Sequence, residues 1–221
     1  MQTLDFTKDL IMENILVIGA HFDDAELGCG GTMAKFVAEG KKVYKLTLTD
    51  NVTNFHQMDI HVDMDSSRID SANACKVLGV KEIEFDMIKC NELTYNTKTM
   101  QKIESIIWDN KIDTVFIHNN SDLNQDHVAA SKLCLTAARH CKNIFYYQSN
   151  GYILDNSYYP TCFIDITNFY EKKKMALYHY QEAHNRFDRL FDIALKRTEI
   201  WGYANKVSYA EGFVPVKICL E

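Results

Sequence analysis

Proline is scarce in this sequence of 221 residues: Pro160 and Pro215 are the only two. The nine glycines are dispersed, and no internal repeat or low-complexity tract is present. Linkers between domains are usually rich in such residues, so nothing marks a domain boundary. A chain of this length fits one large domain better than two small ones. We therefore expect a single domain over residues 1–221, with one active site.

Long apolar runs are also missing, since no stretch of 18 or more apolar residues occurs. This argues against a membrane-spanning helix. Charged residues, among them Asp5, Lys8 and Glu13, break up the apolar positions at the beginning of the sequence, which therefore lacks the core of a signal peptide. We expect a cytoplasmic protein with no membrane span.

Basic residues are fewer than acidic residues. The sequence has 24 Lys and Arg against 30 Asp and Glu, a net charge of -6 and a pI near 5.7. Proteins that follow the phosphates of nucleic acids rely on clustered Lys and Arg, so we expect no nucleic-acid partner. We interpret the short basic patch of Lys172, Lys173 and Lys174 as a solvated helix face.

The seven cysteines form no CxxC pair, and their number is odd. A protein of this size has no need of disulfide staples. Cys29, Cys75 and Cys134 lie in apolar helical patterns, where a free cysteine is usually a small buried hydrophobe. We expect reduced core cysteines, and nothing supports a cysteine nucleophile.

Strand and helix patterns alternate along the chain. Short apolar or β-branched runs predict strands at 14–20, 43–49, 82–85, 114–118, 144–147 and 162–166. Helical periodicity predicts helices at 28–39, 66–78, 97–110, 127–140 and most of 169–198. This alternation predicts an α/β fold, with a doubly wound, mainly parallel sheet and helices on both faces. The polar segment 50–65 has no regular period and is a candidate lid.

Two polar clusters fall at the carboxyl ends of predicted strands, where ligands of such sheets bind. The first follows strand 14–20 and holds His21 and Asp24, with Asp23 between them. The second runs from His118 to His127 and supplies a further imidazole. Two imidazoles and one carboxylate form a three-ligand set, which in catalytic zinc sites leaves the fourth position for water or substrate. Ferrous iron and cobalt suit the same ligands.

The two clusters resemble a known pair of motifs. AHFDDAELGCGGTMA, followed about a hundred residues later by HNNSDLNQDH, is similar to the signature pair of the PIG-L/LmbE-type N-acetylglucosaminyl deacetylases, AHPDDxE and a second motif ending in DH. Softer similarity extends through residues 67–70 and 209–213. The resemblance implies a Rossmann-like domain that holds one zinc and hydrolyses the N-acetyl group of a GlcNAc-containing substrate. It also implies the metal ligands His21, Asp24 and His127, with Asp23 as general base.

Amide hydrolysis accounts for these residue types. Zinc polarises the acetyl carbonyl and lowers the pKa of water to ~7, which leaves a carboxylate that is not a ligand to take the proton. Asp23 suits this role and could pass the proton to the leaving amine. We expect Asp126, beside His127, to orient an imidazole by a hydrogen bond.

Two positions depart from the family pattern. Phe22 stands where the family usually has Pro, which changes the rigidity of the turn but removes no ligand. Asn124 stands where many members carry a His that stabilises the oxyanion of the tetrahedral intermediate. An Asn amide can still donate a hydrogen bond, and His118, His184 or the metal alone are the alternatives.

Several further residues have competing interpretations. Arg68 follows the candidate lid and could bind a phosphate or carboxylate of the substrate, or form a surface ion pair. We favour close packing as the role of the three glycines in the first cluster (Gly28, Gly30, Gly31). For the polar residues of the segment 50–65 we favour a lid rather than a second metal site (His56, His61, Asp63, Asp65). Glu211 is either a functional residue or a structural hydrogen-bond partner.

Three functions remain open at this point. The leading one is a metal-dependent deacetylase acting on a small N-acetylated sugar, free or linked to a nucleotide or lipid. The second is a zinc amidohydrolase of the same family acting on a non-sugar acyl amide. The third is a non-catalytic sugar- or nucleotide-binding protein, which has no chemical need for Asp23 and the ligands together. The sequence leaves the exact substrate and a homo-oligomeric state open.

Overall fold

The computed structural model describes residues 11–55, 60–152, 158–180 and 190–220. Its main sheet has the spatial order β5-β2-β1-β6-β7-β9-β8. The strands are β1 (Asn14–Gly19), β2 (Lys42–Thr47), β5 (Lys81–Ile83), β6 (Thr114–His118), β7 (Asn143–Tyr147), β8 (Cys162–Asp165) and β9 (Ala210–Lys217). The helices are α1 (Asp24–Ala38), α2 (Met64–Leu78), α3 (Thr97–Asp109), α4 (Gln125–Ala137), α5 (Tyr170–Tyr178) and α7 (Asp192–Ala204), with a 3-10 turn at Thr167–Phe169.

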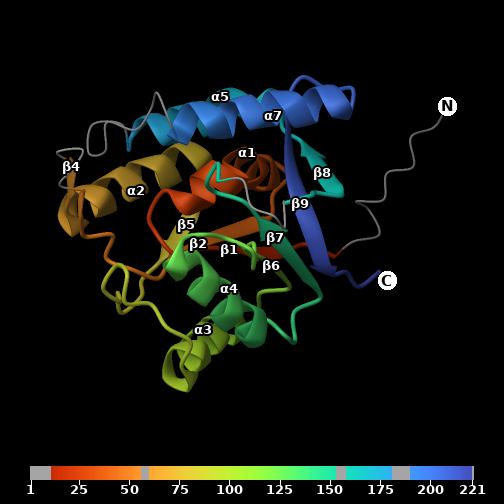
Figure 1. Ribbon diagram of the computed structural model, residues 1–221. Coiled ribbons are helices and arrows are strands. Elements are labelled where there is room, and N and C mark those ends of the chain that lie inside the picture. Colours follow the sequence, from red (N-terminus) through yellow and green to blue (C-terminus); the bar gives the residue numbers. More distant parts are fainter. Residues whose placement is uncertain (1–10, 56–59, 153–157, 181–189, 221) are drawn as a thin grey trace.

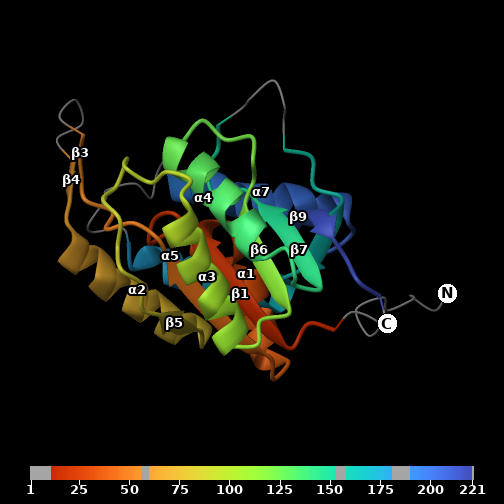
Figure 2. The ribbon, with the colours of Figure 1, turned by 90° about the horizontal axis from the view of Figure 1, so that it is seen from below.

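The sheet is covered on both faces, as Figures 1 and 2 show. Helices α1 and α2 lie on one face, with α5 packed outside them, while α3 and α4 cover the other face. Strand β1 explains why both faces need cover. Its side chains alternate between two apolar cores: Ile15 and Val17 pack on the α1 side, whereas Leu16 and Ile18 pack on the α4 side. The unbroken apolar run is thus a strand buried on both faces, and the α/β prediction is confirmed.

The winding of the sheet reverses between β1 and β6. From β1 the chain proceeds outward through β2 and β5, and it then returns to build β6 and β7 on the other side of β1. These five strands are parallel, with Val17 of β1 paired to Lys45 of β2 and to Phe116 of β6. Ligands of open α/β sheets bind at such a reversal, beyond the carboxyl ends of the strands. Both predicted polar clusters begin at these two strand ends.

The last strand, β9, was not predicted from its sequence. Gly212 and Pro215 lie inside it, and both residues argue against a strand interior. The strand nevertheless runs antiparallel between β7 and β8, with a register shift at its pairing with β7. The similarity over 209–213 therefore falls on a strand of the main sheet.

The segment predicted as an irregular lid contains a small hairpin instead. β3 (Thr53–Phe55) and β4 (Ile60–Val62) pair antiparallel, and short strands of this kind give too few positions for a period to be visible. Asp63 caps α2 by accepting a hydrogen bond from the backbone N–H of Ser66. His56 lies outside the described residues.

Helix ends follow the capping residues. Gly79 ends α2 with φ of 77°, a left-handed conformation that glycine adopts without strain. Helix α1, however, begins at Asp24 and not at Gly28 as predicted, because the polar motif itself forms the first turn. Among the described helices, none is long and apolar enough to cross a membrane.

The interpretation of the lysine patch as a solvated face is wrong for one member. Lys173 is 1% exposed; its Nζ donates to Glu211 Oε1 at 2.5 Å and to the carbonyl of Leu27 at 2.8 Å. Glu211 also accepts from the backbone N–H groups of Gly31 and Thr32 in α1. This carboxylate therefore has the structural role that the sequence left open.

The cysteines agree with the prediction: all seven are free, and Cys29, Cys75 and Cys134 are buried.

Candidate active site

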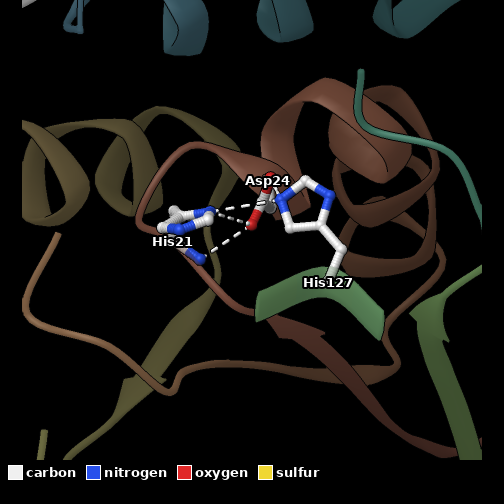
Figure 3. A group of neighbouring side chains, drawn as sticks. All are labelled: His21, Asp24 and His127. Atoms are coloured by element: carbon white, nitrogen blue, oxygen red, sulfur yellow. Dashed lines mark hydrogen bonds and ion pairs between the residues drawn. The ribbon is translucent and has the colours of Figure 1, made fainter. Parts of the chain in front are cut away.

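Three predicted ligands meet where the sheet reverses (Figure 3). His21 Nδ1 lies 3.1 Å from His127 Nε2 and 3.2 Å from Asp24 Oδ2. The other oxygen of Asp24, Oδ1, lies 3.2 Å from His127 Nε2. The structure thus brings His21, Asp24 and His127 together, although 106 residues separate the two imidazoles in the chain.

Local structure directs each of these side chains to the cluster. His21 follows β1, and Asp24 is the first residue of α1, where the positive end of the helix dipole favours a carboxylate. The backbone N–H of His21 donates to Asp24 Oδ2 at 2.7 Å and closes the turn. His127 lies in the first turn of α4, whose N-cap residue is Asn124.

The pairwise distances fit a single metal ion. Around a tetrahedral ion with bonds of 2.0–2.1 Å, neighbouring ligand atoms are about 3.3 Å apart. The two imidazole nitrogens are 3.1 Å apart, and each lies 3.2 Å from one of the two oxygens of Asp24. Two imidazole nitrogens and a carboxylate are also the donor set of catalytic zinc sites. The arrangement therefore suits a divalent cation held by His21, Asp24 and His127.

Each imidazole is backed by a second carboxylate. Asp122 Oδ2 lies 3.0 Å from His127 Nδ1, and Asp126 Oδ2 lies 3.4 Å from His21 Nε2. Such partners fix the ring orientation of a metal-binding histidine. Asp126 was expected to orient an imidazole, and the one it approaches is His21, not its neighbour in sequence. Asp122 was missed; its only signal was a carboxylate five residues before His127.

The carboxylates favour positive charge at the cluster. Burial alone would lower the pKa of His127, but Asp24 and Asp122 outweigh it and raise this pKa to about 9. The pKa of His21 is also raised, because Asp126 and Asp24 outweigh burial. A divalent cation supplies the same positive charge without a proton.

His118 lies behind the cluster, with Nε2 3.1 Å from Asp24 Oδ2, and it is not among the residues that line the pocket described below. It is 1% exposed, and its Nε2 accepts a hydrogen bond of 3.0 Å from the backbone N–H of Ala20. The hydroxyl of Tyr147 lies 3.2 Å from the same nitrogen. Burial, together with His127, lowers the pKa of His118 and keeps the ring neutral. These contacts make His118 a support for the turn at Ala20, and a contact of His118 with substrate stays a prediction.

The cluster opens into a pocket of about 120 Å³. Asp23, 4% exposed, lines it together with the three cluster residues. Leu27 and Leu190 also line it. The remaining lining residues are Asn51, Thr53, Cys90, Asn91, Ser149 and Asn150. Asp23 therefore faces the same small space as the candidate metal ligands.

Asn124 and Arg68 do not line this pocket. Asn124 Oδ1 accepts from the backbone N–H groups of Asp126 at 2.9 Å and of His127 at 3.3 Å, which makes it the cap of α4. Arg68 lines a separate hollow beside Phe22, with Nη1 3.9 Å from Glu84 Oε2. The predicted oxyanion and substrate contacts are therefore not seen at these two residues. His184, an alternative, lies outside the described residues.

A second element holds the loop after β7 in place. Arg197 of α7 donates to the carbonyls of Gln148 at 2.8 Å and Asn150 at 2.5 Å. Asn150 Nδ2 in turn donates to both oxygens of Asp122 at 2.7 Å. Loss of hydration lowers the pKa of Arg197 to about 10, so the guanidinium stays charged at neutral pH. This series of contacts runs from Arg197 through Asn150 and Asp122 to His127, and no sequence motif indicated it.

Hydrogen bonds from buried side chains hold the turn that carries Asp23. Lys45 is fully buried, and its Nζ donates to the carbonyl of Phe22 at 2.6 Å and to Glu26 Oε1 at 2.8 Å. The hydroxyl of Tyr180 donates to the same carbonyl at 2.9 Å. Phe22 itself is 1% exposed. Hydrogen bonds to the backbone thus fix the turn where the family usually has proline.

Comparisons with known proteins indicate the family of this chain. The sequence profile of the PIG-L family, described as GlcNAc-PI de-N-acetylase, matches residues 16–138, more than half of the chain. The uncharacterized deacetylase YaiS of Escherichia coli (strain K12) is 28% identical over 170 residues, which cover 74% of this chain and 88% of YaiS.

Solved structures share the fold at lower identity. N,N'-diacetylchitobiose deacetylase from Pyrococcus horikoshii superposes with a TM-score of 0.80 at 20% identity, over 98% of this chain and 87% of that one. GalB from Pseudomonas putida KT2440, a 4-carboxy-2-hydroxymuconate hydratase, gives 0.78 at 18% identity, over 95% and 98%. These two likenesses establish the fold alone. The family match and the deacetylase relative carry more: this chain belongs to the PIG-L family and is a hydrolytic N-deacetylase enzyme.

Proposed function

We propose that this enzyme removes the N-acetyl group of an amino-sugar derivative, using one divalent metal held by His21, Asp24 and His127. The observation that carries the proposal is the approach of two imidazole nitrogens to 3.1 Å, each 3.2 Å from one oxygen of Asp24, beside a pocket that Asp23 also lines. Zinc is the preferred ion, and ferrous iron or cobalt suit the same ligands.

The metal, when bound, supplies the Lewis acidity that polarises an amide carbonyl and lowers the pKa of water. In the proposed mechanism Asp23 is the general base: it takes a proton from the attacking water and passes it to the leaving amine nitrogen. Asp122 and Asp126 keep His127 and His21 in their orientations. With Asn124 committed to a helix cap, polar groups of the pocket wall such as Asn91 and Ser149 are the candidates to donate to the oxyanion.

Pocket size supports an acetyl group as the part that enters. The described residues enclose about 120 Å³. Pockets that take up a whole drug-sized ligand have roughly 300–1,000 Å³. We propose that the acetamido group is enclosed while the rest of the sugar lies outside, against the loops that carry Asn51 and Thr53. The deacetylase relatives named above, one of them acting on diacetylchitobiose, support an amino-sugar substrate.

The test is release of acetate from a panel of N-acetyl hexosamines, their nucleotide and lipid conjugates, and non-sugar N-acetyl amides. The enzyme is assayed after metal removal and after addition of zinc, iron or cobalt. We expect metal-dependent release from at least one amino sugar. Release only from the non-sugar amides would move the substrate to the alternative class. Activity that is unchanged after verified metal removal would contradict the proposed mechanism.

A further inference from the structure

His21 has a second ring nitrogen that faces a different set of donors. Its Nδ1 belongs to the cluster with Asp24 and His127, whereas its Nε2 lies 3.4 Å from Asp126 Oδ2. Cys90 completes this side: one ligand atom from each of His21, Cys90 and Asp126 lies within 4.8 Å of the other two. The imidazole of His21 therefore stands between two groups of potential metal ligands.

The second group has the chemistry of a site for a soft divalent cation. An imidazole, a thiolate and a carboxylate all bind Zn²⁺, and a thiolate selects zinc or cobalt over magnesium or calcium. Cys90 is partly exposed and lines the pocket, so an ion entering the pocket can reach its Sγ. Asp126 is fully buried behind it.

We propose that Cys90, Asp126 and His21 Nε2 form a second, inhibitory site for zinc or a similar cation, with His21 as a bridge between the two ions. This second site rests on the proposed function, because it shares His21 with the first metal site and lies in the wall of the proposed substrate pocket. Binding releases the proton of the Cys90 thiol and the Nε2 proton of His21, which leaves a thiolate and a bridging imidazolate as ligands.

The second site is weaker than the first. Its His21 Nε2 and Asp126 Oδ2 are 3.4 Å apart, against contacts of 3.1–3.2 Å in the first cluster. Asp126 also accepts hydrogen bonds from the backbone N–H groups of Asn91 and Leu93, so its charge is already shared. An ion at this site occupies the wall of the pocket that is proposed to admit the acetamido group. The first equivalent of metal thus activates the enzyme, and excess metal inhibits it.

Cobalt titration of the metal-free enzyme separates the two sites. The first cluster has no sulfur ligand, so a sulfur-to-cobalt charge-transfer absorption in the near ultraviolet reports Cys90 alone. We expect one equivalent of Co²⁺ to bind without this absorption and to activate the enzyme. A second, weaker equivalent produces the absorption, and activity falls in step with it. Zinc produces the same activation and inhibition.

Cys90→Ser is the decisive variant, with Cys219→Ser as the matched control because Cys219 is exposed on the last described segment. Each variant is compared with its own activity at one equivalent of metal. Cys90→Ser should lose the absorption and weaken inhibition by more than the ~10–100-fold typical for loss of an outer partner. Cys219→Ser should behave as the unmodified enzyme.

The outcomes distinguish this inference from the proposed function. The second site is overturned, and the first left intact, if no sulfur absorption appears even with excess cobalt, or if Cys90→Ser does not relieve inhibition by excess zinc. Failure to bind even one equivalent tightly overturns the proposed metal centre itself.

Discussion

The two segments that supply the imidazoles, the turn after β1 and the first turn of α4, direct opposite ring nitrogens to the cluster. His21, from the turn after β1, offers Nδ1 to the cluster and turns Nε2 toward Asp126. His127, from the first turn of α4, offers Nε2 and turns Nδ1 toward Asp122. Asp126 thus supports the histidine of the other loop. Adjacency in sequence, as in Asp126-His127, does not identify which carboxylate supports which imidazole.

The largest effects should come from removing either imidazole. If both loops hold one ion, His21→Ala and His127→Ala each leave two of three ligands, so metal is released and turnover falls to that of the metal-free enzyme. Metal content after dialysis, measured with the activity, checks this. Retention of a full equivalent by either variant would show that the loop concerned does not bind the ion.

Asp23→Asn should separate catalysis from metal binding. The substitution keeps the size of the side chain but removes the base, so we expect full metal content and turnover lower by at least ~100-fold. Steady-state kinetics and metal analysis of the same preparation provide the measurement. Near-normal turnover would remove Asp23 from the mechanism.

Asp122→Asn and Asp126→Asn test the supporting carboxylates against each other. We expect metal affinity to fall ~10–100-fold, the usual cost of losing such a partner. The loss should be larger for Asp122, whose oxygen is 3.0 Å from its imidazole against 3.4 Å for Asp126. Competition with a chelator of known affinity ranks the two variants. The reverse order would mean that Asp126, and not Asp122, is the stronger support.

The smallest effect should come from Asn124→Ala. Loss of a helix cap typically costs ~1 kcal/mol of stability, which thermal unfolding can detect. Turnover should change only a few-fold by comparison with the ~100-fold expected at the general base. Asn124→Asp is the control, because it restores the cap but not the amide donor. A large loss of turnover in both variants would return Asn124 to the oxyanion role.

Sequence patterns predicted the parts of the fold that depend on local features, such as an apolar run or a glycine at a helix end. The run 14–20 gave a buried parallel strand because β1 is covered on both faces, and Gly79 marked the end of α2. Strand β9 was missed because Gly212 and Pro215 oppose a strand, and the pairing with β7 and β8 that stabilises it is long-range.

The site also divides into local features that could be predicted and long-range contacts that could not. His21, Asp24 and His127 were proposed together because they match the two motifs of the family resemblance, and both motifs fall at the carboxyl ends of predicted strands. The pairing of His127 with Asp122 and the contacts of Arg197 depend on how the loops fold over one another. Lys173 was misjudged because its partner, Glu211, is 38 residues away on another element.

Anomalous scattering at the zinc edge from crystals grown with one equivalent of zinc tests the central claim most directly. We predict one ion about 2.0–2.2 Å from His21 Nδ1, His127 Nε2 and an oxygen of Asp24. Asp23 should face the ion without binding it. An ion bound elsewhere, or none at these three side chains, would contradict the proposed metal centre.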